Sequence, residues 1–313
     1  MLRSMYSGIS GLKNFQTKLD VIGNNIANVN TYGFKKGRVI FKDLMSQTQA
    51  GASGPSLTAG GTNPQQVGLG SSLATIDTIH GSGSRQTTGR VLDIAVEGEG
   101  FFMVAKYNPD GDGESVAGED FDSVAYTRAG NFYMDEQGFL VDASGNYVVG
   151  IQGWEGTAED DVDLPLVEDA GTALEYDSED WDELQTEVTG TRIRIPTDAQ
   201  SMSISTDGKV TFVDSEGLKF AGQIVMAKFP NAEGLTKEGN NYFQESANSG
   251  AVQIGVGNTF GIGKAVSGAL EMSNVDLSEE FTEMIVAQRG FQANTRIITT
   301  SDEILQELVN LKR

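Results

Sequence analysis

The sequence predicts an α+β fold in which two coiled-coil-like helices, one at each end of the chain, flank a mainly antiparallel β body. Three observations support this class. Apolar residues recur at helical spacing near both termini, strand patterns with turn residues fill the middle, and the charge is distributed unevenly between ends and middle. The chain has 313 residues, which is enough for two or three compact units.

The first predicted helix covers residues 1–29, where apolar side chains recur at steps of three and four. These residues are Leu2, Met5, Ile9, Leu12, Phe15, Leu19, Ile22, Ile26 and Val29. The spacing gives one narrow apolar stripe, close to a coiled-coil repeat. The turn-forming residues Asn28, Asn30 and Gly33 then favour an end to the helix.

A second helix is predicted from Asp276, an N-cap residue with Glu279 three positions on as its capping partner. The apolar residues of its seam are Leu277, Phe281, Met284, Phe291, Ile298 and Leu305. Polar residues recur every seven positions where a strong coiled coil would have apolar ones, at Gln288, Thr295 and Asp302. A half-polar seam predicts a helix that is marginal alone. Such a segment is an ordinary intramolecular partner of the first helix, a poorly folded tail, or a helix that neighbouring copies complete.

The charges of the two ends are opposite. Residues 1–45 carry a net charge of +5 and residues 270–313 a net charge of −4, so the total of −22 leaves −23 on the middle. The ends can therefore pack closely, within or between copies, without the repulsion that the total charge suggests. The acidic middle argues against nucleic acid and anionic membrane surfaces as partners.

The β body is predicted from strands separated by turns. Residues 90–104 show strand, glycine turn and strand, with Gly98 and Gly100 in the turn. Two hairpins are expected, one across Asp142 to Gly145 and one across Asp207 and Gly208. The turns at Asp135 to Gly138 and Asp214 to Gly217 look similar to each other. Residues 46–72 are rich in Gly, Ser, Thr, Gln and Ala, which is typical of an extended connector.

The sequence thus predicts four kinds of region. Residues 1–45 and 270–313 form paired helical ends, residues 46–72 connect, residues 73–153 and 192–269 form the β-rich body, and residues 154–191 are an acidic insert or small outer domain. The insert holds fourteen carboxylates and no Lys or Arg. A solvated surface is the simplest interpretation of that composition.

Catalytic and cofactor motifs are scarce in the sequence. His80 is the only histidine and there is no cysteine, which excludes disulfides and the common zinc ligand sets, and we expect His80 to be an ordinary loop residue. The glycines near positions 68 and 255 match neither a dinucleotide fingerprint nor a phosphate-binding loop. We therefore expect no enzyme activity and no cofactor.

One spacing fits a calcium loop. Asn108, Asp110, Asp112, Gly113 and Glu119 occupy positions 1, 3, 5, 6 and 12 of that pattern, although an acidic hairpin loop explains the same residues. The N-terminus lacks the continuous apolar run of a secretory signal peptide, and no stretch approaches the roughly 18 apolar residues of a membrane span.

Five motifs resemble those of the axial proteins of the bacterial flagellum. They are NFQTKLDVIGNNIANVNTYGFKK (14–36), DIAVEGEGFF (93–102), YTRAGNF (126–132), SGALEMSNVDL (267–277) and AQRGFQANTRIITTSDEILQ (287–306). The last of these looks like the hook version in particular. Neither the acidic insert nor residues 108–123 belong to the shared motifs.

The resemblance implies a structural subunit that is exported by the flagellar type III apparatus without a cleaved signal and polymerises with many copies of itself. The paired terminal helices would form an inner tube of the extracellular hook, a curved universal joint that transmits torque from rod to filament. Rod proteins, hook-filament junction proteins, the hook cap and the export apparatus would be its partners, with no nucleic acid and no membrane insertion. The expected polymerisation interface comprises Leu2, Met5, Ile9, Leu12, Leu19, Ile22, Ile26, Phe281, Met284, Phe291, Ile298 and Leu305.

Two alternatives stay open. A distal rod subunit of the basal body shares the terminal motifs, although the length added by the acidic insert and the run at residues 290–295 favour the hook. A calcium-dependent extracellular binding module would account for residues 108–119 and the acidic body, but it would leave the helical ends unexplained.

Overall fold

The structure is a computed structural model that describes residues 2–55, 60–107, 121–152, 191–215 and 217–311. The calcium-loop residues Asn108, Asp110, Asp112 and Glu119 and nearly all of the acidic insert lie outside the described residues. The chain divides into two units. Unit 1 comprises Met1–Val29, Lys35–Ile79 and Val275–Arg313, and unit 2 comprises Asn30–Phe34 and His80–Asn274.

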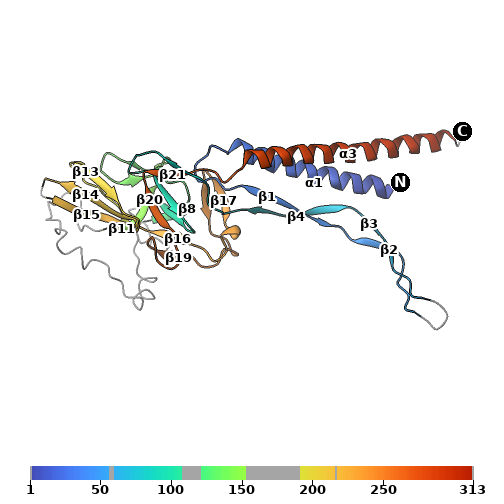
Figure 1. The fold of residues 1–313 in the computed structure, drawn as a ribbon, viewed down its shortest axis with the longest axis horizontal. Helices are drawn as coiled ribbons and strands as arrows, with labels where there is room; N and C mark the ends of the chain where they lie inside the picture. The colour runs from blue at the N-terminus through green and yellow to red at the C-terminus, as the bar shows by residue number, and fades with distance from the viewer. Residues whose placement is uncertain (1, 56–59, 108–120, 153–190, 216, 312–313) are drawn as a thin grey trace. The chain divides into compact units, whose positions relative to one another are not determined.

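Unit 1 contains the helices α1 (Leu2–Ala27) and α3 (Leu277–Asn310), which run side by side (Figure 1). Their direction is antiparallel, because Gly8 lies against Ile298, Gly11 against Asn294 and Phe15 against Gly290. The side chain of Asp276 accepts hydrogen bonds from the N–H groups of Ser278 and Glu279, which confirms the predicted N-cap. The carboxylate of Glu279, predicted to complete the cap, instead contacts Lys36.

Two antiparallel ribbons complete unit 1. Strand β1 (Gly37–Asp43) pairs with β4 (Ser71–Thr78), and β2 (Ser46–Ala50) pairs with β3 (Gln65–Gly68). The first ribbon packs on α1, since the rings of Phe15 and Phe41 lie 6.2 Å apart and Asn14 Nδ2 donates to Ser71 Oγ at 2.8 Å. Residues 46–72, expected as a connector, therefore contain β2, β3 and the start of β4.

Unit 2 is built from antiparallel strands. They are β5 (Arg85–Thr87), β6 (Ile94–Glu97), β7 (Phe101–Tyr107), β8 (Phe121–Thr127), β9 (Tyr133–Met134), β10 (Leu140–Val141), β11 (Tyr147–Gln152), β12 (Thr191–Arg192), β13 (Ser201–Ile204), β14 (Lys209–Asp214), β15 (Gly217–Ile224), β16 (Met226–Lys228), β17 (Thr236–Gly239), β18 (Tyr242–Gln244), β19 (Gln253–Gly255), β20 (Lys264–Ser267) and β21 (Ala269–Glu271). A 3-10 turn, η2, spans Ala232–Gly234. The main sheet follows the order β13-β14-β15-β11-β7-β8-β18-β17. With α1 and α3, these strands confirm the predicted α+β class.

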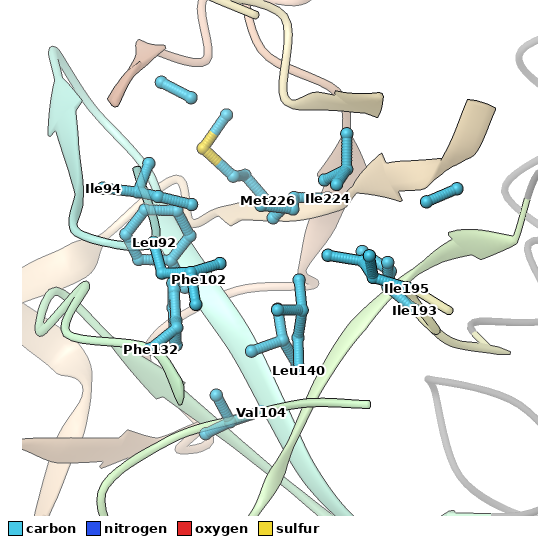
Figure 2. Close-up of a cluster of buried hydrophobic side chains, with 14 of the residues drawn as sticks. Leu92, Ile94, Phe102, Val104, Phe132, Leu140, Ile193, Ile195, Ile224 and Met226 are labelled. Atoms are coloured by element: carbon cyan, nitrogen blue, oxygen red, sulfur yellow. The ribbon is translucent and has the colours of Figure 1, made fainter. Parts of the chain in front are cut away.

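Strand β7 lies between two apolar cores. Phe102 and Val104 belong to one core, shown in Figure 2, and Phe101, Met103 and Ala105 belong to the other. Successive side chains of a strand point to opposite faces, so a strand that is buried on both faces is apolar at every position. This explains the continuous run FFMVA, in which all five residues are buried.

The predicted hairpins form with the expected turns. Met202 pairs with Phe212 across the turn at Asp207, and Val141 pairs with Tyr147 across the turn that begins at Asp142. The carboxylate of Asp142 accepts hydrogen bonds from the N–H groups two and four residues on, and Asp135 does the same in its own turn. The two strands flanking Gly98 and Gly100 do not pair with each other, because β6 pairs with β20.

Candidate assembly surface

The contact between α1 and α3 is made largely by small and polar residues. A Cβ atom on Gly290 would lie 2.5 Å from the ring of Phe15, and one on Gly11 would lie 2.9 Å from Asn294 Oδ1. A Cβ atom at either position would force the neighbouring side chain to move, so the two helices approach closely here. At each of these positions a glycine of one helix makes room for a larger side chain of the other.

The buried positions of α3 correct one part of the predicted seam. Glu280, Ala287 and Ser301 are buried at intervals of seven and fourteen residues, whereas the predicted polar positions Gln288, Thr295 and Asp302 are exposed. The heptad that faces α1 therefore lies one residue before the predicted one. Small or polar residues predominate at both of the two heptad positions that lie one residue apart. The pattern of apolar residues alone therefore could not show which of them faces α1.

Charged and amide side chains contact one another where α1 ends and α3 begins. Lys18 Nζ lies 2.6 Å from Glu283 Oε2, and Lys36 Nζ lies 2.8 Å from Glu279 Oε2. Asn25 is 2% exposed and its amide donates to Glu280 Oε2 at 3.2 Å. Exposed ion pairs of this kind contribute about 0 to 1 kcal/mol each, so they fix geometry more than they stabilise.

The large apolar side chains of α3 point mostly away from α1. The exposed ones are Leu277, Phe281, Ile285, Val286, Phe291, Ile297, Ile304, Leu308, Val309 and Leu311, with exposed fractions between 36% and 82%. On α1, Tyr6 and Ile9 are exposed as well. An ordinary helix pair buries its large apolar residues at the seam and leaves polar residues outside. Large exposed apolar surfaces in soluble proteins mark sites of association.

The twelve residues predicted for the polymerisation interface fall into distinct groups. Ile9, Phe281 and Phe291 are exposed, and Ile22 is buried within unit 1. The remaining ones are partly buried: Met5, Leu12, Leu19, Ile26, Met284, Ile298 and Leu305. The side chain of Leu2 lies outside the described part of the chain. The exposed apolar residues at positions 285, 286, 297, 304 and 308 were missed, because they do not share the predicted seam.

The ribbon of β2 and β3 forms a second exposed surface. Every residue of both strands is exposed, and the run from Leu44 to Ile76 contains no charged residue in a chain that is 21% charged. Charged residues are depleted at the centres of protein interfaces, and a lone two-stranded ribbon is marginally stable in water. The absence of charge was a signal in the sequence that the prediction of a connector did not use.

His80 and the metal hypothesis need only brief description. The imidazole ring of His80 is partly buried against Phe101 and Phe243, with ring centroids 5.5 and 5.2 Å away, as suits a packed loop residue. Within the described residues, no three His, Cys, Asp or Glu side chains cluster in a way that could hold a metal ion. No helix in that same part of the chain is both long and apolar enough to span a membrane.

The exposed apolar side chains of both helices and the charge-free ribbon indicate a protein that associates with other protein chains. Three family models match the sequence. The Flagella basal body rod protein model matches residues 5–35, the Flagellar hook protein FlgE/F/G D1 domain model matches residues 95–212, and the Flagellar basal body rod FlgEFG protein C-terminal model matches residues 266–311.

Individual relatives agree with these models. The flagellar basal-body rod protein FlgG of Bacillus subtilis is 54% identical over 318 aligned residues, covering 100% of both chains. The flagellar hook protein FlgE of Borreliella burgdorferi is 34% identical over 457 aligned residues, again with 100% of both chains covered. The chain therefore belongs to the FlgE/F/G family of flagellar rod and hook proteins, and it is a structural subunit of the flagellar axis.

One solved structure also matches. The crystal structure of the Helicobacter pylori flagellar hook protein FlgE2 aligns with 39% of this chain and 24% of its own, at 24% identity and a TM-score of 0.24. A score at that level does not define a shared architecture. The assignment to the family rests on the sequence matches.

Proposed function

We propose that the protein is a subunit of the flagellar basal-body rod, and that many copies of it polymerise through the outward apolar faces of α1 and α3. The observation that carries this proposal is the 54% identity with a basal-body rod protein over the full length of both chains. The hook relative is 34% identical, and its alignment needs 457 positions for this chain of 313 residues. The sequence motifs alone favoured the hook over the rod, whereas the identities of the relatives favour the rod over the hook.

The energetic argument starts from the exposed side chains. Burying one large apolar side chain contributes about 1.5 to 3 kcal/mol. Phe281, Ile285 and Leu308 are each about half exposed in the single chain, so each retains a substantial part of this contribution for contacts with neighbours. Several such contacts in each copy favour a long polymer over a free subunit, after the cost of immobilising each copy is subtracted.

The ribbon supports the same proposal. Residues 46–50 and 65–68 present uncharged polar side chains and free strand edges, which can pack on a neighbour without desolvating charge. We propose that β2 and β3 become covered when subunits assemble. A second set of contacts outside the helix pair restricts relative motion between copies, which suits a stiff rod.

Location and partners follow from the family. We propose that the subunit reaches the flagellar axis through the flagellar export apparatus without a cleaved signal, and that it contacts other rod or hook proteins at the ends of its own polymer. The alternative is a hook subunit, in which the same helices would form a curved tube. No observation on the described residues favours a calcium-binding function.

The test is negative-stain electron microscopy of the concentrated full-length chain. We expect straight rods from the wild type and no polymer from Phe281→Asp, which places a charge on the outward apolar face. Curved tubes from the wild type would transfer the assignment to the hook. A wild-type chain that remains monomeric at high concentration would contradict polymerisation through these faces, as would normal rods from Phe281→Asp.

A further inference from the structure

Glu280 is a carboxylate buried in the contact between α1 and α3. Its side chain is 6% exposed and faces Asn25, whose amide nitrogen lies 3.2 Å from Glu280 Oε2. The same amide nitrogen donates to the carbonyl oxygen of Gly37 at 2.9 Å, and the amide oxygen accepts from the N–H of Gly37 at 3.0 Å. Asn25 thereby joins the end of α1, the start of β1 and the first turn of α3 in one small polar cluster.

The nearby cations contact other carboxylates. Lys36 lies 2.8 Å from Glu279, Lys18 lies 2.6 Å from Glu283, and Arg38, next to Gly37 on β1, lies 3.4 Å from Asp77 on β4. Asp276, one turn before Glu280, caps α3. Among the described residues, no Lys or Arg forms an ion pair with Glu280, and Asn25 provides its only side-chain hydrogen bond.

A buried carboxylate with one neutral donor is costly in its ionised form. Burial raises the pKa of Glu280 above its ordinary value of 4.5. The hydrogen bond from Asn25 and the charge of Lys36 oppose this rise in pKa, while the charges of Glu283 and Glu279 add to it. The folded helix pair therefore binds a proton more tightly than the unfolded chain does.

The sign of the pH effect follows from this difference. Because the folded pKa lies above the unfolded one, the contribution of Glu280 to the stability of the pair is largest below pH 4.5 and declines as the pH rises through the raised value. Glu280 therefore stabilises the pair less as the pH rises from acid toward neutral.

We propose that Glu280 is a built-in destabiliser of the α1–α3 pair, which keeps the helical ends of a free chain weakly paired at neutral pH until neighbouring copies cover them. This inference rests on the proposed assembly function. Neighbours that bind only the paired state shift the chain toward pairing by mass action. When α1 and α3 are only weakly paired, a free chain does not present the apolar faces of both helices together. Association then depends on contact with an existing polymer end.

The direct test compares the full-length chain with Glu280→Gln, which mimics the protonated side chain at every pH. Both α-helices of the described residues belong to unit 1, so circular dichroism at 222 nm follows their pairing. We expect Glu280→Gln to raise the helix melting midpoint by about 2 to 4 °C at pH 7 and to have little effect near pH 4.5. The matched control Glu279→Gln, at an exposed ion pair one residue earlier, should not raise the midpoint.

A second variant probes the same cluster from α1. Asn25→Asp places a second carboxylate beside Glu280, so the helix signal should fall at pH 7 and recover at pH 5. Adding Glu280→Gln to Asn25→Asp should restore part of the signal at pH 7. Recovery in acid distinguishes an electrostatic effect from simple misfolding of the variant.

Assembly gives the functional outcome. At pH 7, Glu280→Gln should polymerise without added seeds at a concentration several-fold below that of the wild type, as measured by light scattering. A melting midpoint for Glu280→Gln equal to or below that of the wild type, or equal to that of Glu279→Gln, would overturn the inference. An unchanged threshold for unseeded assembly would overturn it too. Failure of the wild type to polymerise, even with a normal shift in melting, would instead count against the proposed function.

Discussion

Phe102, Phe132 and Ile224 in unit 2 are completely buried, whereas Phe281, Ile285 and Leu308 in unit 1 are exposed by 49%, 59% and 50%. Unit 2 places its large side chains in two cores on either side of β7. Unit 1 fills its helix contact with small and polar residues and turns its large side chains outward. One unit thus buries its large apolar side chains, and the other leaves many of them exposed.

The largest effect is expected from Phe102→Ala, which creates a cavity in the core of unit 2. Phe102 is fully buried and packs edge-on against Phe132, with ring centroids 5.1 Å apart. Such substitutions lower the free energy of unfolding by about 3 to 5 kcal/mol. Urea unfolding monitored by near-ultraviolet circular dichroism would measure the loss. A change below about 1 kcal/mol would show that unit 2 does not depend on this core.

The same truncation at the outward face should separate assembly from folding. Ile285→Ala removes an exposed side chain, so the free energy of unfolding of the free chain should change by less than about 0.5 kcal/mol. The critical concentration for polymerisation should rise about tenfold or more, because each 1.4 kcal/mol corresponds to a factor of ten. Sedimentation of polymer against free subunit measures this. A large loss of monomer stability would mean that unit 1 covers Ile285 itself.

Glycine positions test the close helix contact. Gly290→Ala forces a methyl group against the ring of Phe15 and should cost the helix pair about 1 to 3 kcal/mol. Gly23→Ala is the matched control on α1, because no atom lies within 4 Å of the added Cβ and alanine favours helix by about 0.8 to 1.0 kcal/mol. Thermal melting at 222 nm should therefore move in opposite directions for the two variants. Equal shifts would refute a tight seam at Gly290.

The smallest effect on the free chain is expected in the ribbon. Gln47→Glu adds a charge at an exposed position of β2, so monomer stability should stay within about 0.5 kcal/mol. If neighbours cover this ribbon, desolvating the new carboxylate should raise the critical concentration several-fold. Gln292→Glu, an exposed change on α3, provides a comparison at the helices. An unaltered critical concentration for Gln47→Glu would remove the ribbon from the proposed interface.

Spacing and turn residues were enough to predict the local features of the fold. Periodic apolar residues predicted the two terminal helices, Asp276 predicted the start of α3, and alternating strands with Asp and Gly turns predicted the antiparallel hairpins. Each depends on contacts between residues near one another in the chain, where spacing and turn chemistry act directly. The family was equally accessible, because the terminal motifs at residues 14–36 and 267–306 lie in or beside the segments that the terminal family models match.

Which faces are buried became known only from the three-dimensional arrangement of the elements. The heptad of Glu280, Ala287 and Ser301 faces α1, and β6 pairs with the distant strand β20 rather than with its neighbour β7. Both choices depend on partners far away in sequence, and a polar or small residue satisfies more than one register until its partner is known. For the same reason, the outward apolar stripes and the buried carboxylate of Glu280 became visible only when the distant helix had been placed beside its partner.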